Sequence, residues 1–204
     1  MRLVLASASP ARLKTLRAAG LDPEVLVSGV DESQVTEADP AMLATELATR
    51  KARTVAAAVQ DAWVVGCDSV LEIDGQVHGK PGDPESARRR WRAMRGRTGV
   101  LHTGHCVIDT GSGREVVRAA RTVVRFAAVT DAEIDAYVDT GEPLEVAGAF
   151  TIDGLGGAFV DGVEGDPHTV VGISLPLLRR MLAELGVRWT DLWTPAVAGA
   201  TEGG

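Results

Sequence analysis

The residue whose position most favours chemistry is Asp68, which follows a short apolar run, residues 63–67. Such a run predicts a buried strand, and α/β folds bind ligands beyond the carboxyl ends of their strands. A carboxylate there could hold a magnesium ion or accept a proton from an attacking water. The alternative is an aspartate that only caps a turn, and the local sequence leaves both interpretations open.

Hydroxyl and guanidinium donors suited to phosphate lie near the amino terminus. A strand expected over residues 3–6 ends in a turn that begins at Ser7. The turn leads into an expected helix that has Pro10 in its first turn and includes Arg12. Free backbone N–H groups and the helix dipole favour an anion at such a helix start. The alternative is a plain serine cap followed by a surface arginine.

Two lysines lie where the surrounding sequence restricts the position of the side chain. Lys51 lies between Leu47 and Val55 on the apolar stripe of a helix expected over residues 40–59. It must therefore either extend to the edge of the stripe or face an anion. Lys80 lies in a loop of glycines and prolines before the next helix, which by itself is weak evidence for a site.

Other charged groups have simpler interpretations when taken alone. Asp31 and Glu32 follow another expected strand, where a carboxylate pair is usually a solvated turn. The basic run over residues 88–95 resembles a nucleic-acid-binding stripe, but its arginines point around most of a helix. A solvated basic helix is therefore favoured.

The composition narrows the class of function. The chain of 204 residues has a net charge of −7, which argues against a protein that coats a nucleic-acid backbone. No apolar run approaches the roughly 18 residues of a membrane helix. Cys67 and Cys106 lack the spacing of a metal or redox motif and are expected to be buried thiols in a reducing compartment. We therefore expect a cytoplasmic protein without a nucleic-acid or membrane partner.

The order of the expected elements predicts an α/β fold. Helices and strands alternate, but hairpins intervene at residues 74–75 and between two long strand candidates, residues 100–108 and 116–129. We therefore expect a mixed β-sheet with flanking helices rather than a purely parallel sheet. The folded domain is expected over residues 1–190, and residues 191–204 are expected to form a disordered tail.

Together these segments resemble the Maf family of nucleoside triphosphate pyrophosphatases over about residues 3–186. The matching motifs occur in the order of the family and are Leu5-Ala6-Ser7-Ala8-Ser9-Pro10-x-Arg12, Gly29-Val30-Asp31-Glu32, the Lys51 helix, Gly66-Cys67-Asp68-Ser69, Gly79-Lys80-Pro81, Pro143-Leu144, Ala147-Gly148, Gly154-Leu155-Gly156-Gly157 and Val171-Gly172-Ile173-Ser174-Leu175-Pro176. Each motif is short, and the specificity of the resemblance comes from their joint order and spacing.

The resemblance implies a fold and a set of phosphate-binding residues. The family has a mixed α/β sheet with two lobes around a nucleotide-binding cleft, similar to the ITPase fold, and often forms a homodimer. Ser7 and Arg12 would bind the triphosphate, and Lys51 and Lys80 would add positive charge.

The resemblance also implies a reaction. Glu32 and Asp68 would hold a divalent cation, Mg²⁺ or Mn²⁺, and Asp68 would be the general base for water attack at the α-phosphorus of a nucleoside triphosphate, whether common or modified. The products would be a nucleoside monophosphate and pyrophosphate. The alternative that the resemblance leaves open is a nucleotide-binding regulator of cell division with little or no turnover.

Two positions depart from the family pattern. Ala11 stands where the family often has a second arginine or a bulky residue, and Asp153 stands where members that prefer dTTP and UTP commonly have glutamine. Asp153 is expected to contact substrate, yet a carboxylate cannot donate the hydrogen bond that a glutamine amide could. The preferred base therefore stays open.

Overall fold

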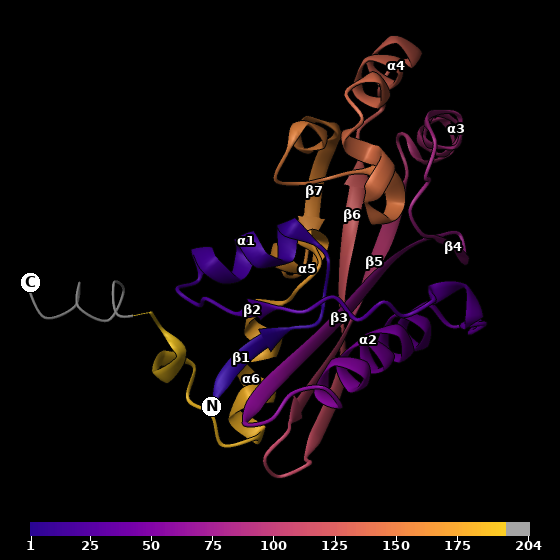
Figure 1. Ribbon diagram of the computed structural model, residues 1–204. Coiled ribbons are helices and arrows are strands. Elements are labelled where there is room, and N and C mark those ends of the chain that lie inside the picture. Colours follow the sequence, from indigo (N-terminus) through magenta and orange to yellow (C-terminus); the bar gives the residue numbers. More distant parts are fainter. Residues whose placement is uncertain (195–204) are drawn as a thin grey trace, which may run out of the picture.

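A seven-stranded mixed sheet runs the length of the molecule and carries helices on both faces (Figure 1). The computed structural model describes residues 1–194. Their elements, in chain order, are β1 (Arg2–Leu5), α1 (Pro10–Ala18), β2 (Glu24–Val25), η1 (Glu32–Gln34), α2 (Pro40–Ala56), β3 (Ala62–Ile73), β4 (Gln76–His78), α3 (Pro84–Met94), β5 (Thr98–Asp109), β6 (Glu115–Phe126), α4 (Asp131–Asp139), η2 (Glu142–Glu145), η3 (Ala147–Ala149), η4 (Leu155–Phe159), β7 (Val160–Glu164), α5 (Pro167–Val171), α6 (Leu175–Glu184) and η5 (Trp189–Leu192).

The strand order is β2-β1-β3-β5-β6-β7, with β4 paired to β3. β1 is parallel to both of its neighbours, whereas β3 pairs antiparallel with β4 and β5, and β6 pairs antiparallel with β5 and β7. The expected mixed α/β sheet with flanking helices is therefore confirmed. A Pro follows a capping residue at the start of four α-helices, where the side chain of Ser9, Asp39, Asp83 or Asp166 accepts a backbone N–H of the first turn.

The core is divided among three clusters. One lies between the sheet and helices α1 and α6, and another lies on the opposite face under α2. The third lies at the far ends of the long strands, where α3 and α4 pack (Figure 1). Separate cores at the two ends of β3, β5 and β6 correspond to the two expected lobes, and the nucleotide-binding cleft between them stays a prediction.

Close packing of α2 on the sheet depends on two glycines that face it. A Cβ added at Gly66 would overlap the carbonyl oxygen of Ala48 and lie 2.8 Å from the backbone nitrogen of Ala52. A Cβ at Gly104 would likewise overlap the backbone of Ala44. Because α2 carries Lys51, these glycines set how closely that lysine approaches the sheet.

Replacing Gly66 by alanine is expected to lower the free energy of unfolding by about 3 kcal/mol, since the helix must move away from the sheet. Urea denaturation followed by circular dichroism measures this decrease. Gly79→Ala is the control, because nothing lies within 4 Å of a Cβ added at Gly79. Equal stability of the two variants would contradict the packing argument.

The folded part of the chain extends beyond the boundary expected at residue 190. Leu192 and Trp193 pack against the α1/α6 core, and the backbone N–H of Thr194 donates to the carbonyl of Gly20 at 2.9 Å. Leu192 and Trp193 are partly buried against this core, so ordered packing continues past residue 190. The disorder expected for residues 195–204 lies outside the described residues.

No helix among residues 1–194 is long and apolar enough to cross a membrane.

Candidate active site

The site lies at an interruption along one edge of β3. β1 pairs with residues 62–65 of β3 and β4 pairs with residues 71–73, while β5 occupies the other edge. Within the described part of the chain, residues 66–70 of β3 have no strand beside them on the β1 edge. Asp68 lies in the middle of this open edge.

Asp68 is paired with the buried lysine of α2. The Nζ of Lys51 lies 2.5 Å from Oδ1 of Asp68 and 2.6 Å from Oε1 of Glu32. Lys51 is 8% exposed and Asp68 is 7% exposed. The sequence left open whether Lys51 extends to the edge of its stripe or faces an anion; the ammonium faces two carboxylates.

The electrostatics of Asp68 suit a proton acceptor. Burial raises the pKa of this carboxyl, although the positive charges of Lys51 and Arg12 oppose the shift. A base of raised pKa binds a proton more strongly than an exposed aspartate does. The two neighbouring cations favour the ionised form of the carboxylate, which is the form that can accept a proton.

The guanidinium of Arg12, a residue of α1, donates to three acceptors. Its Nε donates to the carbonyl of Gly172 at 2.7 Å, one terminal nitrogen donates to Oγ of Ser7 at 2.9 Å, and the other donates to Oγ of Ser69 at 3.2 Å. The Ser69 hydroxyl lies 2.9 Å from Oγ1 of Thr103 on β5. The structure thus brings Ser7 and Arg12 together.

The two cations lie on opposite faces of β3. Successive side chains of a strand point to opposite faces, so Asp68 faces α2 whereas Ser69 faces α1. Lys51 therefore approaches the open edge from one side of the sheet and Arg12 approaches it from the other. A chain of phosphates running past this edge could contact both.

Lys80 and Asp153 pair with other residues than those of this centre. Lys80 follows β4, its side chain is 60% exposed, and its nearest acidic partner is Glu145 at 4.0 Å. Asp153 lies 3.6 Å from the Nζ of Lys14 on α1. Within residues 1–194 no hydrogen bond or ion pair joins Lys80 or Asp153 to Asp68, so their expected roles stay predictions.

Sequence reasoning missed several residues of the site. Ser69, Thr103, Gly172 and Lys14 were not predicted, although all four contact a predicted site residue or its neighbour. Only Ser69 had a local signal, because it follows Asp68 on the strand. Gly172 contacts Arg12 from 160 positions along the chain, which no local pattern indicates.

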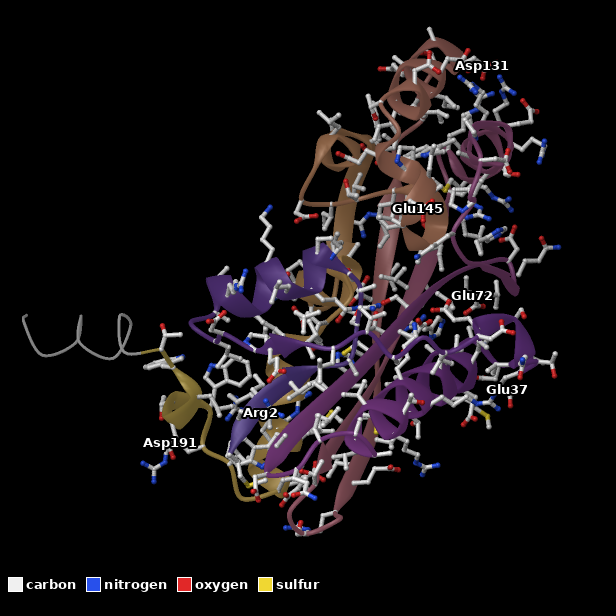
Figure 2. All side chains as sticks on the ribbon, viewed as in Figure 1. Arg2, Glu37, Glu72, Asp131, Glu145 and Asp191 are labelled. Carbon is white, nitrogen blue, oxygen red and sulfur yellow. The ribbon has the colours of Figure 1, made fainter. Side chains whose placement is uncertain are left out.

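The basic run on α3 is not a free basic surface. Nε of Arg88 lies 2.9 Å from Asp135, and a terminal nitrogen of Arg95 lies 2.6 Å from Asp131. Both aspartates belong to α4, and Asp131 is labelled in Figure 2. The sequence favoured a solvated helix over a nucleic-acid-binding stripe; in the structure these partly exposed arginines also pair with α4. The sequence did not indicate these ion pairs, because they join two helices that are separated along the chain.

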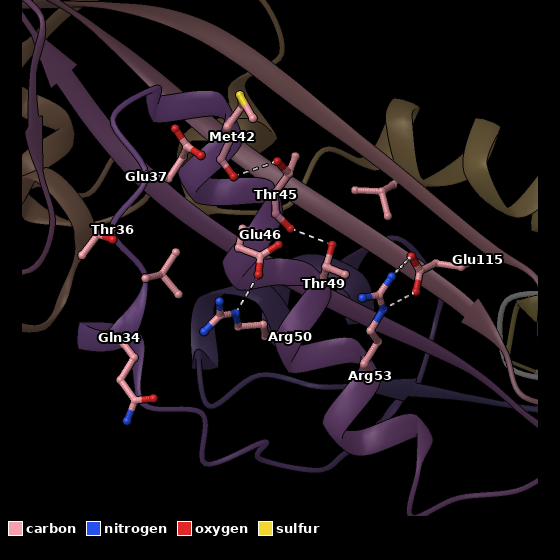
Figure 3. A pocket seen from close by; sticks show the side chains of 12 residues that line it. Gln34, Thr36, Glu37, Met42, Thr45, Glu46, Thr49, Arg50, Arg53 and Glu115 are labelled. Carbon is pink, nitrogen blue, oxygen red and sulfur yellow. Dashed lines mark hydrogen bonds and ion pairs between the residues drawn. The ribbon is translucent and has the colours of Figure 1, made fainter.

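A groove of about 520 Å³ lies along the outer face of α2 and is lined by none of the predicted site residues (Figure 3). Its two arginines are already paired, Arg50 with Glu46 at 2.7 Å and Arg53 with Glu115 at 2.8 Å. A phosphate in this groove would have to compete with a carboxylate for either arginine. The geometry at Asp68, rather than this groove, defines the candidate site.

The side chains present also suit a divalent cation bound together with phosphate. Glu32 and Asp68 direct carboxylate oxygens at one point, the Nζ of Lys51. Among residues 1–194 no group of three or more His, Cys, Asp or Glu side chains could hold a metal by itself. One or two carboxylates completed by substrate phosphates is, however, the usual donor set for Mg²⁺.

Fold and site together define an α/β protein in which two buried cations and a buried carboxylate converge on an open sheet edge, an arrangement suited to a phosphate-bearing ligand. The Maf-like protein family model matches residues 2–185, and the chain therefore belongs to this family.

Relatives match over nearly the whole chain. A protein of Streptomyces coelicolor named nucleoside triphosphate pyrophosphatase is 64% identical, covering 96% of this chain and 96% of its own length. One of Salinispora tropica with the same name is 61% identical, covering 95% of this chain and 88% of its own. The solved structure of the Staphylococcus aureus Ham1 protein aligns with a TM-score of 0.49 and 13% identity, over 100% of this chain and 99% of that one. A likeness this distant says nothing about activity.

Proposed function

We propose that the chain hydrolyses nucleoside triphosphates to nucleoside monophosphates and pyrophosphate. The observation that carries the proposal is the position of Asp68, a buried carboxylate at an open strand edge with Lys51 and Arg12 on either side. The relatives named nucleoside triphosphate pyrophosphatase support the same reaction.

Local charge supports an anionic substrate although the chain carries −7 overall. A triphosphate brings roughly four negative charges, and fixed cations held near it determine the local potential. Arg12 presents its guanidinium with the Nε fixed on Gly172, so its remaining N–H groups are oriented before the ligand arrives. Lys51 can exchange a carboxylate for a phosphate oxygen, and Lys80 can approach from the loop after β4.

The reaction step requires one base. Water attacks the α-phosphorus, the bond to the bridging α–β oxygen breaks, and its electrons leave with pyrophosphate, while Asp68 takes the proton of the attacking water. Lys51 and Lys80 stabilise the negative charge that develops on the leaving group. Because Asp68 is almost fully buried, bulk water competes little for its proton.

We also propose that Glu32 and Asp68 hold a divalent cation, Mg²⁺ or Mn²⁺, together with the phosphates. When bound, it would neutralise phosphate charge and lower the pKa of the attacking water. For Glu32 to take part, its contact with Lys51 must open, and this contact is the more exposed of the two that Lys51 makes.

Product analysis tests the proposal. The protein is incubated with Mg²⁺ and each of dTTP, UTP, CTP, GTP and 7-methyl-GTP, and the products are separated chromatographically. Monophosphate and pyrophosphate in equal amounts are the expected result. Diphosphate and orthophosphate would place the attack at the γ-phosphorus, and binding without turnover would favour the regulator.

Replacing Asp153 by glutamine is expected to raise the kcat/KM for dTTP and UTP relative to GTP about tenfold, roughly the difference that one hydrogen bond makes. A carboxylate can accept both N–H groups of a guanine edge, whereas a glutamine amide can also donate to a carbonyl of thymine or uracil. Steady-state kinetics with the three substrates measures the ratio.

Lys14→Met is the matched control for this substitution, because it removes the pair with Asp153 but keeps the carboxylate. Its base ratio should equal that of the wild type. A ratio that shifts equally in both variants would show that the ion pair, and not the carboxylate, selects the base.

A further inference from the structure

The carboxylate of Glu142, at the start of η2, is enclosed by the loop before β7. Its Oε1 accepts hydrogen bonds from the hydroxyl of Tyr137 at 2.8 Å, from Oγ1 of Thr151 at 2.5 Å and from the backbone nitrogen of Gly156 at 3.0 Å. Its Oε2 accepts from the backbone nitrogen of Leu155 at 2.9 Å. One carboxylate thus receives four donors, three of which belong to one short loop.

The glycines of this loop lie where a side chain would not fit. A Cβ added at Gly154 would lie 2.6 Å from Oε2 of Glu142, and one added at Gly156 would lie 2.8 Å from the carbonyl oxygen of Thr151. A Cβ at Gly157 would lie 2.6 Å from the carbonyl oxygen of Ile152. Gly154 therefore leaves room for the Glu142 carboxylate, while Gly156 and Gly157 let the loop backbone pack closely on itself and, at Gly156, on the hydroxyl of Tyr137.

Glu142 remains charged inside this loop. Burial raises the pKa of its carboxyl, but the hydrogen bonds from Thr151, Leu155, Gly156 and Tyr137 outweigh burial and lower it. The charge strengthens each of the four hydrogen bonds.

The loop also reaches the helix that carries Arg12. Asp153 belongs to it, and its carboxylate lies 3.6 Å from the Nζ of Lys14 on α1, the helix that carries Arg12. The loop is thus held firmly at Glu142 and contacts α1 through Asp153. Any displacement of its backbone moves Asp153 relative to Arg12.

We propose that Glu142 is a positioning residue that fixes the loop over residues 151–157, so that Asp153 meets the nucleotide base in one arrangement. The proposal rests on the function proposed above. Glu142 acts through the loop and does not touch the reacting atoms, so it governs KM and base preference rather than kcat.

The test replaces Glu142 by glutamine. The amide oxygen can keep the contacts of Oε1, but the amide NH₂ then faces the N–H of Leu155, donor against donor. The KM for GTP and for dTTP is expected to rise about tenfold with kcat within about twofold, and the ratio of the two kcat/KM values is expected to move toward one. Dissociation constants for the α,β-methylene analogues of both nucleotides give a readout independent of turnover.

Two further variants make the result decisive. Tyr137→Phe removes one of the four donors and keeps the charge, so it should show the same change in smaller degree even if Glu142→Gln folds poorly. Asp161→Asn removes an exposed carboxylate on β7 and should leave KM and base ratio unchanged.

The possible outcomes separate the two proposals. A lower Tm in Glu142→Gln and Tyr137→Phe with unchanged KM, base ratio and analogue binding would overturn the positioning role and leave a structural one. If the wild type binds both analogues but hydrolyses neither nucleotide, the proposed hydrolysis fails, while the comparison of dissociation constants still decides the role of Glu142.

Discussion

Replacing Asp68 by asparagine is expected to lower kcat about 1,000-fold, within the range that a positioned general base contributes. Asparagine has nearly the same shape, but its amide cannot accept the proton of the attacking water. KM should change much less, because Arg12 still holds its three partners and Lys51 can still bind a phosphate oxygen. Single-turnover measurements with a saturating nucleotide isolate this effect on the chemical step.

The pH dependence of the wild type should show the same base. The ordinary value for an aspartate is 3.8, and burial raises the pKa of Asp68 above it. Activity should therefore fall as the pH drops through this raised pKa, at a higher pH than for an exposed aspartate. The asparagine variant should lack this acid limb, and retention of the limb would assign it to another group.

The stability of the same variant has an expected sign. Because the pKa of Asp68 is higher in the folded than in the unfolded state, ionisation of this carboxyl opposes folding above the folded pKa, and this cost is absent below the unfolded pKa. Asparagine carries no such charge, so the Tm of Asp68→Asn at neutral pH should be close to or above that of the wild type. A clearly lower Tm would show that the pair with Lys51 contributes more than the burial of the charge costs.

Replacing Lys51 by methionine is the second large effect, and it should impair both activity and stability. The substitution leaves Asp68 buried without its closest cation, and removal of one partner of a buried pair typically costs about 3–5 kcal/mol. The attraction of Lys51 also opposes the raised pKa of Asp68, so the acid limb should move to higher pH. Because methionine cannot bind a phosphate oxygen either, kcat/KM should fall about 100-fold or more.

Two comparisons test this interpretation of Lys51. Arg50→Met changes the preceding residue of α2, which pairs with Glu46 at the surface, and should alter stability by at most about 1 kcal/mol. The double variant Lys51→Met/Asp68→Asn should be more stable than Lys51→Met alone, because no carboxylate remains buried at that position. A double variant less stable than Lys51→Met would contradict the pairing.

Much of the fold could be predicted because its signals are local. The helix expected with Pro10 in its first turn is α1, and the helix expected from residue 40 is α2, which begins at Pro40 but ends at Ala56. The long strand candidates over residues 100–108 and 116–129 correspond to β5 and β6, although β6 ends at Phe126.

What the sequence did not indicate depends on contacts between distant segments. The apolar stripe of α2 identified Lys51 as unusual, yet no pattern showed that Asp68 and Glu32 would meet at its ammonium. The residues 154–157 were recognised as a glycine motif, but Glu142, which accepts two of its backbone N–H groups, lies on another segment. A sequence pattern predicts which residues have a restricted position. The partners that restrict them follow only from the tertiary structure.

Hydrolysis in water enriched with ¹⁸O tests the central claim most directly, because it locates the attacked phosphorus. The protein is incubated with Mg²⁺ and its best substrate, and both products are analysed by mass spectrometry. The account predicts one ¹⁸O atom in the monophosphate and none in the pyrophosphate in the wild type, with the same pattern at a rate about 1,000-fold lower in Asp68→Asn. Label in the pyrophosphate would place the attack at the β-phosphorus, and an undiminished rate in Asp68→Asn would remove Asp68 as the base; either result would contradict the account.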